Sequence, residues 1–180
     1  IDYAKNGMRN ELLDFYLISK CKFFISCGTG LDSVACMFRR PNVVVNYASF
    51  GQVQISPNIK LFIPKHFFDK SKKRLMTFRE IFNLRAQFVT TQTFLDLQNI
   101  KLIDNTTEEI DSVIYEMEMR LEGKWQDSIE DKELQKRFKS IWPYNELFSG
   151  PFENSQLLKN KKTLPNIGAH FLKTNSHLLD

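Results

Sequence analysis

The stretch FFISCGTGLDSVACMFRRPNVVVNY (Phe23–Tyr47) decides how the rest of the chain is interpreted. Its first residues belong to a short apolar run, Lys22–Ser26, which is typical of a strand buried on both faces of a parallel sheet. A glycine-containing turn, Cys27–Gly30, follows and leads into a helix that we expect from about Leu31 to Phe38. The β-branched run Asn42–Tyr47 is the clearest strand in the sequence. This alternation predicts an α/β protein with a Rossmann-like parallel sheet flanked by helices.

Hydrophobic spacing, capping residues and composition define the other expected elements. The expected helices are Asn10–Lys20, Phe78–Leu84, a helix that Thr106 opens and Gly123 ends, Ser128–Trp142 and Pro165–Leu179. The expected strands are Ile59–Pro64 and Lys101–Asp104, and the segments Ala48–Pro57 and Pro143–Thr163 are expected to be irregular. The composition changes after Trp125. We therefore expect a Rossmann-like domain over residues 1–125 and a helical C-terminal extension over residues 126–180 that packs on it.

Bulk composition limits the class of protein. Hydrophobic residues make up 42% and charged residues 26% of the 180 residues, as in an ordinary globular protein. No apolar run approaches the roughly 18 residues of a membrane-spanning helix, and the three cysteines lack disulfide or zinc-site spacing, which favours a reducing compartment. The net charge of +4 comes with only short basic clusters, so no nucleic-acid partner is expected. Because the chain opens at Ile1 without a methionine or a leader peptide, we expect a fragment whose N-terminal part is missing.

The glycine turn has the layout of an anion-binding site. The amides at the start of the following helix have no partner within the helix and carry a partial positive charge. Gly28 and Gly30 permit a positive φ and the close approach of a ligand, while Ser26 and Thr29 add hydroxyl groups. A purely structural alternative stays open, in which Thr29 and Asp32 cap the helix and the glycines only fit the turn.

Two familiar phosphate-binding patterns do not fit this turn. The dinucleotide fingerprint requires glycine or alanine where Ser33 stands, and an acidic residue at the end of the next strand, where this chain has Asn46 and Tyr47. A P-loop requires a lysine after its second glycine, and none follows Gly30. We therefore expect neither NAD binding nor ATP hydrolysis. The carboxylate of Asp32 would repel a phosphate at close range, so we expect it to cap the helix or to contact sugar hydroxyls.

Three segments resemble one family of enzymes. They are DFYLISKCKFFISCGTGLDSVACMFRRPNVVVNY (Asp14–Tyr47), RLMTFREI (Arg74–Ile81) and IGAHFL (Ile167–Leu172). They look like the donor-binding half of GT-B glycosyltransferases, and more closely like glycosyltransferases of bacterial surface-polysaccharide clusters. The resemblance is dense over residues 1–47 and patchy beyond, and it departs from the family at Cys27, where a small hydroxyl residue is expected. It implies the C-terminal half of a GT-B architecture, in which two Rossmann-like domains face a cleft.

The resemblance implies that this half holds the diphosphate of a nucleotide sugar through backbone amides of the turn, without a metal or another cofactor. Glu80 would accept hydrogen bonds from ribose hydroxyls or cap its helix, and Lys65 and His66 would reach the cleft or lie on the surface. The candidate donor-binding residues are Ser26, Gly28, Thr29, Gly30, Leu31, Asp32, Asn46, Tyr47, Thr77, Arg79 and Glu80. No catalytic residue is assigned, because the general base of such enzymes lies in the N-terminal domain.

The expected reaction of the full-length protein is hexosyl transfer from a nucleotide sugar to a surface glycan or a lipid-linked acceptor. It would occur in the cytoplasm or at the inner face of the membrane, and the isolated chain is expected to be inactive. Two alternatives stay open: a sugar-nucleotide epimerase, and a non-catalytic module that binds a phosphorylated ligand or a partner chain. An epimerase needs acid and base groups across the cleft, and this chain has only three histidines.

Overall fold

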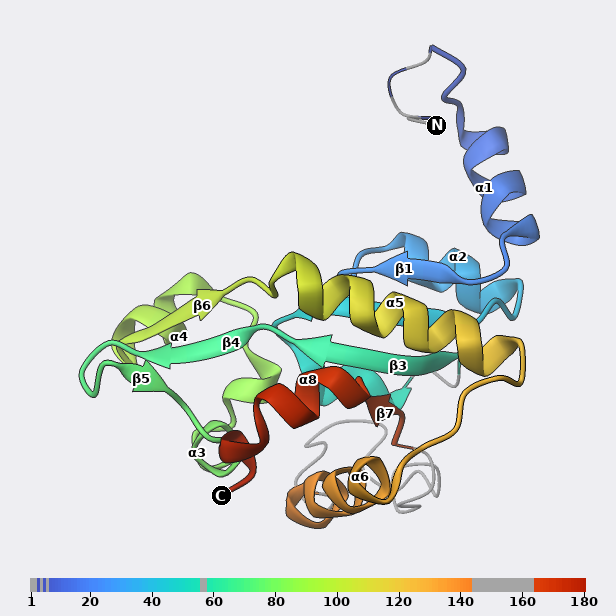
Figure 1. Ribbon diagram of the computed structural model, residues 1–180. Helices are drawn as coiled ribbons and strands as arrows, with labels where there is room; N and C mark the ends of the chain where they lie inside the picture. The colour runs from blue at the N-terminus through green and yellow to red at the C-terminus, as the bar shows by residue number, and fades with distance from the viewer. Residues whose placement is uncertain (1–2, 4, 6, 56–57, 144–163) are drawn as a thin grey trace.

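A computed structural model describes residues 3, 5, 7–55, 58–143 and 164–180. At its centre is a parallel sheet with the strand order β1-β2-β3-β7 (Figure 1). Its strands are β1 (Phe24–Ser26), β2 (Asn42–Tyr47), β3 (Ile59–Pro64) and β7 (Asn166–Ile167). The expected α/β class, with a parallel sheet flanked by helices, is confirmed. The sequence placed β2 and β3 at their observed bounds because β2 has a β-branched centre and β3 is mostly apolar, with Lys60 as its one exposed residue.

Helices cover the parallel sheet. They are α2 (Leu31–Met37), α5 (Thr107–Leu121), α6 (Ile129–Ile141) and α8 (Ala169–Thr174), whereas α1 (Glu11–Lys20) packs on α2. α5 packs on β2 and β3, and α8 packs against both α5 and α6. Asn10 caps α1, and Thr106 and Glu109 form the capping box of α5, as their spacing predicts. None of the helices in the described part of the chain combines the length and the apolar composition needed to cross a bilayer.

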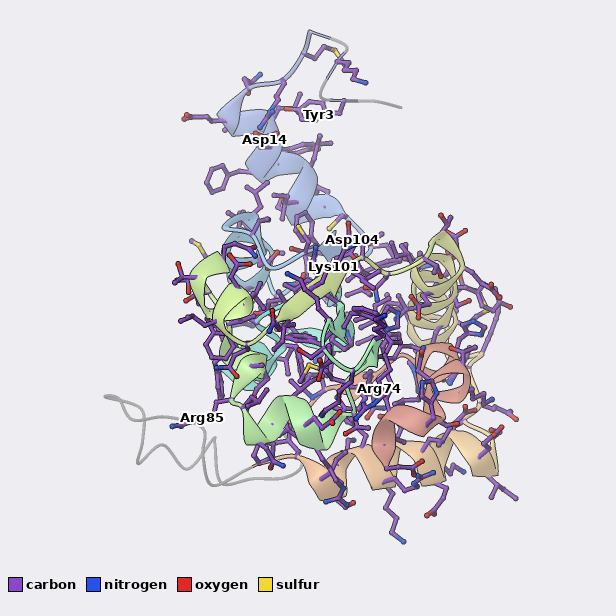
Figure 2. The ribbon with its side chains drawn as sticks, turned by 90° about the vertical axis from the view of Figure 1, so that its left-hand side faces the viewer. Tyr3, Asp14, Arg74, Arg85, Lys101 and Asp104 are labelled. Carbon is purple, nitrogen blue, oxygen red and sulfur yellow. The ribbon has the colours of Figure 1, made fainter. Side chains whose placement is uncertain are left out.

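α1 projects from the body of the molecule (Figure 1 and Figure 2). It packs against α2 through Ile18, whereas Leu12 is 81% exposed and Phe15 and Tyr16 are also exposed. Its apolar side chains are therefore not confined to the face that touches the body.

The chain leaves the parallel sheet at Lys65 and enters a second, antiparallel sheet with the order β5-β4-β6. Its strands are β4 (His66–Asp69), β5 (Arg74–Leu75) and β6 (Ile100–Ile103), and α3 (Phe78–Asn83), a 3-10 turn (Ala86–Phe88) and α4 (Gln92–Leu97) lie between β5 and β6. β6 matches the strand expected near this position. β4 and β5 were not predicted, because Pro64 ends the preceding apolar run and the segments after it are too short to show an alternating pattern.

An aromatic cluster fills the centre of the core. Phe50 is fully buried and begins a 3-10 helix, Phe50–Ile55, within the segment that the sequence marks as irregular. Its ring lies 6.0–6.4 Å, centroid to centroid, from five other aromatic rings, which belong to Phe62, Phe67, Phe78, Phe82 and Trp142. These rings come from β3, β4, α3 and the end of α6. One side chain therefore joins both sheets and two helices.

The C-terminal part of the chain is not only helical. The prediction of a single helix over residues 165–179 is wrong, because Asn166 and Ile167 form β7, and α8 and a 3-10 turn (Ser176–Leu179) follow. Gln135 of α6 accepts a hydrogen bond from the Ile167 amide and donates one to its carbonyl, which satisfies the side of β7 that faces away from β3. Residues from both sides of position 125 share one hydrophobic core. Residues 144–163, most of the second segment expected to be irregular, lie outside the described residues.

Candidate functional site

The turn between β1 and α2 has two glycines with different roles. Gly28 has a φ of +83°, in the left-handed region that favours glycine, and its amide donates to the Ser26 hydroxyl at 3.0 Å. Gly30 has a φ of −58° and stands at the N-cap of α2, where no side chain caps the helix. The capping role considered for Thr29 and Asp32 is therefore not observed. The amides of Asp32 and Ser33 donate instead to the carbonyls of Thr29 and Gly30, at 3.0 and 3.2 Å.

Tyr47, at the end of β2, explains the need for glycine at position 28. A Cβ atom on Gly28 would lie 2.5 Å from Cε2 of the Tyr47 ring, whereas one on Gly30 would meet no atom within 4 Å. Burial raises the pKa of the Tyr47 hydroxyl, and the carboxylate of Asp32 raises it further. The close approach that Gly28 permits in this structure is that of the Tyr47 ring.

A cleft of about 490 Å³ opens at the carboxyl ends of β1, β2 and β3. Its lining consists of Cys27, Gly28, Asn46, Tyr47, Ala48, Ser49, Gln52, Lys65, Thr90 and Asp104. Ligands of parallel α/β sheets bind in this kind of position, outside the carboxyl ends of the strands. Of the residues that the sequence nominates, Gly28, Asn46 and Tyr47 line the cleft.

Lys65 and Asp104 bring opposite charges into the cleft. Lys65 directly follows β3, Asp104 directly follows β6, and the two side chains form an ion pair. Lys65 is half-buried, and the Asp104 side chain is 69% exposed. The sequence predicted that Lys65 would either reach the cleft or lie on the surface, and it gave no role to Asp104. The signal for both is a charged residue directly after a predicted strand.

The side chain of Asn46 holds the cleft wall together. Asn46 adopts a φ of +51°, its amide donates to Oδ1 of Asn105 at 2.7 Å, and the Asn105 amide donates to Oδ1 of Asn46 at 2.6 Å. Asn105 also donates through Nδ2 to the carbonyl of Pro64 at 2.8 Å. This network fixes the end of β2 and the end of β3 to the segment before α5. The side-chain oxygen of Asn46 is therefore used to hold the backbone at Asn105.

Asp32 lies beside the cleft residues without lining the cleft. Burial raises the pKa of its carboxyl group, and the Ser26 hydroxyl lowers it. Its Oδ1 atom is buried and has no hydrogen-bond partner among the described residues. Thr29, Gly30 and Leu31 are exposed and are not part of the described lining of the cleft.

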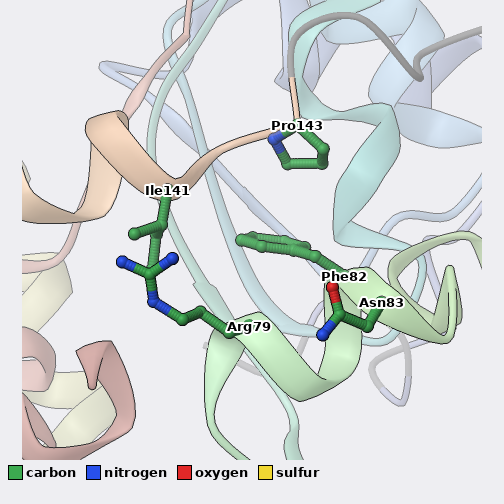
Figure 3. Close-up of a pocket in the computed structure, with 5 residues that line it drawn as sticks. All are labelled: Arg79, Phe82, Asn83, Ile141 and Pro143. Carbon is green, nitrogen blue, oxygen red and sulfur yellow. The ribbon is translucent and has the colours of Figure 1, made fainter.

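The structure places Arg79 and Glu80 on α3 and Thr77 at its N-cap, and none of the three lines the cleft. Glu80 completes the capping box with Thr77, and the guanidinium of Arg74 and the ammonium of Lys72 hold the pKa of its carboxyl well below the usual range. This arrangement is the capping alternative stated for Glu80. Arg79 lines a separate hollow of about 180 Å³ with Phe82, Asn83, Ile141 and Pro143 (Figure 3). The two hollows share no described residue.

His66 faces the core and not the cleft. Its Nε2 lies 2.9 Å from Oε1 of Glu109, and its ring stacks on Phe171. Glu109 also accepts hydrogen bonds from the Thr106 amide at 2.9 Å and from Nδ2 of Asn175 at 3.1 Å. Burial raises the pKa of Glu109, but the bonds from His66, Thr106 and Asn175 outweigh it and lower the pKa to about 2. The carboxylate of Glu109 therefore joins the start of α5 to β4 and to the end of α8.

This buried carboxylate predicts a loss of stability in acid. Its pKa rises from about 2 in the folded protein to the ordinary 4.5 on unfolding, so its contribution is present above pH 4.5 and is lost as the pH falls toward 2. We expect Glu109 to account for about 3 kcal/mol of that loss. Urea unfolding of the wild type and of Glu109→Gln at stepped pH measures it. Glu108→Gln, a neighbouring exposed carboxylate, is the matched control. Parallel pH profiles for the wild type and Glu109→Gln would contradict the assignment.

Comparison with known proteins defines no family for this chain. No family model matches it, and no curated protein or solved structure matches it. The fold and the cleft therefore define an α/β protein with a parallel sheet and a polar cleft at the carboxyl edge of that sheet.

Proposed function

We propose that this chain is the donor-binding half of a GT-B type glycosyltransferase and that its cleft binds the nucleoside diphosphate portion of a nucleotide sugar. The observation that carries the proposal is the position of the cleft, at the carboxyl ends of three parallel strands and beside the glycine turn. The start of α2 adds the positive end of the helix dipole next to the glycine turn, although the amides of Asp32 and Ser33 already donate to the carbonyls of Thr29 and Gly30.

The proposal gives individual roles to the cleft residues. The ammonium of Lys65 would exchange Asp104 for a diphosphate oxygen, since a charge-assisted hydrogen bond to a more highly charged group is the stronger one. The side chains of Ser49, Gln52 and Thr90 supply polar groups for ribose and sugar hydroxyls. Tyr47 keeps the turn in shape through its contact with Gly28.

In this proposal the chain binds the donor and stabilises the departing nucleoside diphosphate with fixed positive charge. An acceptor hydroxyl attacks the anomeric carbon while the bond to the diphosphate breaks, and a base outside this chain removes the hydroxyl proton. The acceptor would be a surface glycan or a lipid-linked sugar, and the reaction would occur in the cytoplasm or at the inner face of the membrane. The epimerase alternative receives less support, because no histidine belongs to the described lining of the cleft.

Cys27 provides a direct test of ligand binding in the cleft. It is exposed and lines the cleft, whereas Cys21 and Cys36 are half-buried and do not. We expect a nucleoside diphosphate at about ten times its Kd to slow alkylation of Cys27 by iodoacetamide about tenfold, because only the free protein reacts. Peptide mass spectrometry across a panel of nucleoside diphosphates measures the rates, with Cys21 and Cys36 as internal references.

Two lysine variants make the test specific. Lys65→Gln should lower the affinity for the protecting nucleotide about tenfold. Lys70→Gln removes an exposed lysine outside the cleft lining and should leave that affinity unchanged. If no nucleoside diphosphate protects Cys27 in the folded protein, or if both variants behave alike, the proposed site is incorrect.

A further inference from the structure

A second hollow lies between α6 and the start of β7, away from the cleft. Its volume is about 490 Å³, and its lining includes Lys132, Lys136 and Lys139 of α6 together with Asp127 and Asn166. We call it the lysine hollow. Asn166 begins β7, whereas the cleft opens at the carboxyl ends of β1, β2 and β3, and the two linings share no described residue.

Positive charge in the lysine hollow exceeds negative charge. The only carboxylate in its described lining is Asp127, which is already bound by the guanidinium of Arg120 and accepts a hydrogen bond from Nε1 of Trp125 at 2.9 Å. Lys132 and Lys136 stand one helical turn apart, a like-charge spacing that costs stability in an isolated helix. The hollow therefore contains three ammonium groups and no carboxylate that is free to neutralise them.

Lys139 is the least solvated of these cations. It is half-buried, and its ammonium donates to Oδ1 of Asn166 at 2.6 Å, a neutral acceptor. Burial lowers its pKa, the carboxylate of Asp127 only partly offsets this, and the guanidinium of Arg120 lowers the pKa further. A half-buried ammonium with a neutral partner retains donors for an anionic ligand.

Other polar groups of the hollow are occupied within the protein. The amide of Gln135 is bonded to the main chain of Ile167, and the Ser140 hydroxyl donates to the carbonyl of Arg137 at 2.7 Å. Recognition in this hollow therefore depends on the ammonium groups. Three lysines lining one hollow suit a compact, multiply charged oxyanion better than a single carboxylate.

We propose that the lysine hollow binds the phosphoryl group of a small molecule. This site is independent of the proposed nucleotide-sugar cleft, and neither proposal requires the other. A phosphoryl dianion there accepts hydrogen bonds from Lys136 and Lys139 and relieves the repulsion between Lys132 and Lys136.

The test is a titration with inorganic phosphate and, separately, with glycerol phosphate, at constant ionic strength. Amide and lysine side-chain NMR signals of the full chain report the site. We expect saturable shifts at Lys136, Lys139 and Asn166, and a higher pKa of the Lys139 ammonium in the presence of phosphate. A stronger response to glycerol phosphate than to inorganic phosphate assigns the site to a phosphorylated metabolite, and the reverse assigns it to the free ion.

Matched variants separate a site from general attraction of anions. Lys136→Gln and Lys139→Gln should each weaken binding about tenfold, whereas Lys101→Gln, an exposed lysine on β6, should leave it unchanged. Lys136 is exposed, so its variant remains informative if Lys139→Gln destabilises the fold. The proposal is overturned if phosphate produces no saturable shifts, if the three variants respond equally, or if only long polyanions such as RNA bind.

Discussion

Replacing Phe50 with alanine should lower the free energy of unfolding by about 4 kcal/mol. Phe50 is completely buried and contacts five aromatic rings that belong to both sheets and to two helices. Removing its ring leaves a cavity that these neighbours cannot all close at once, because each is held by its own element. Urea unfolding followed by far-ultraviolet circular dichroism measures the loss.

The matched control is Phe15→Ala on α1. Phe15 is 44% exposed, so the same truncation should cost less than about 1 kcal/mol. Equal losses for the two variants would show that Phe50 is not the centre of the core. A loss below about 1 kcal/mol for Phe50→Ala would have the same meaning.

Replacing Gly28 with valine should destabilise the protein by about 3 to 5 kcal/mol. Two costs combine, because a β-branched residue is strained at a φ of +83° and its Cβ would lie 2.5 Å from Cε2 of Tyr47. The ring of Tyr47 must then move out of its half-buried position. Thermal and urea unfolding report the loss, and Tyr47→Ala in the Gly28→Val background should recover part of it by removing the clash.

Gly30→Val is the control for this variant. Gly30 has a φ of −58° and open space around it, so the substitution should change stability by less than about 1 kcal/mol. Equal losses at both glycines would contradict the geometry of the turn. The difference also matters for binding experiments, because Gly28→Val perturbs the fold and Gly30→Val tests the turn without that complication.

Local signals predicted a large part of the fold correctly. The bounds of β2 and β3 follow from their β-branched and mostly apolar composition, and the starts of α1, α3 and α5 follow from their capping residues. These features depend on side chains within a few residues of one another. A single sequence therefore contains all the information that they require.

Long-range pairing accounts for most of what was missed. β7 has only two residues, and its extended form depends on pairing with β3 and on hydrogen bonds from Gln135. Its sequence alone fits the start of a helix equally well. Phe50 lies in a segment with no periodicity, and only the tertiary structure gathers the five rings around it.

The candidate site divides in the same way. Parallel-sheet topology explains why residues at the carboxyl ends of β1 and β2 meet in one cleft. On this basis the sequence assigned Gly28, Asn46 and Tyr47 to one site, and all three line the cleft. The sequence did not predict the contact of the Tyr47 ring with Gly28, or the ion pairs of Arg74 and Lys72 with Glu80. Asp104 joins the cleft through the antiparallel sheet, which the sequence did not predict.

The pairing of Leu61 with Asn166 sets the order in which this chain can fold during synthesis. β1, β2 and β3 leave the ribosome early, but one edge of β3 stays unpaired until β7 has been made. Closing so long a loop is entropically costly, so this step should be slow compared with the formation of α5 or α6. Until then the exposed edge of β3 can pair with strands of other chains. Chaperone dependence during expression should therefore be greatest for nascent chains that end before β7.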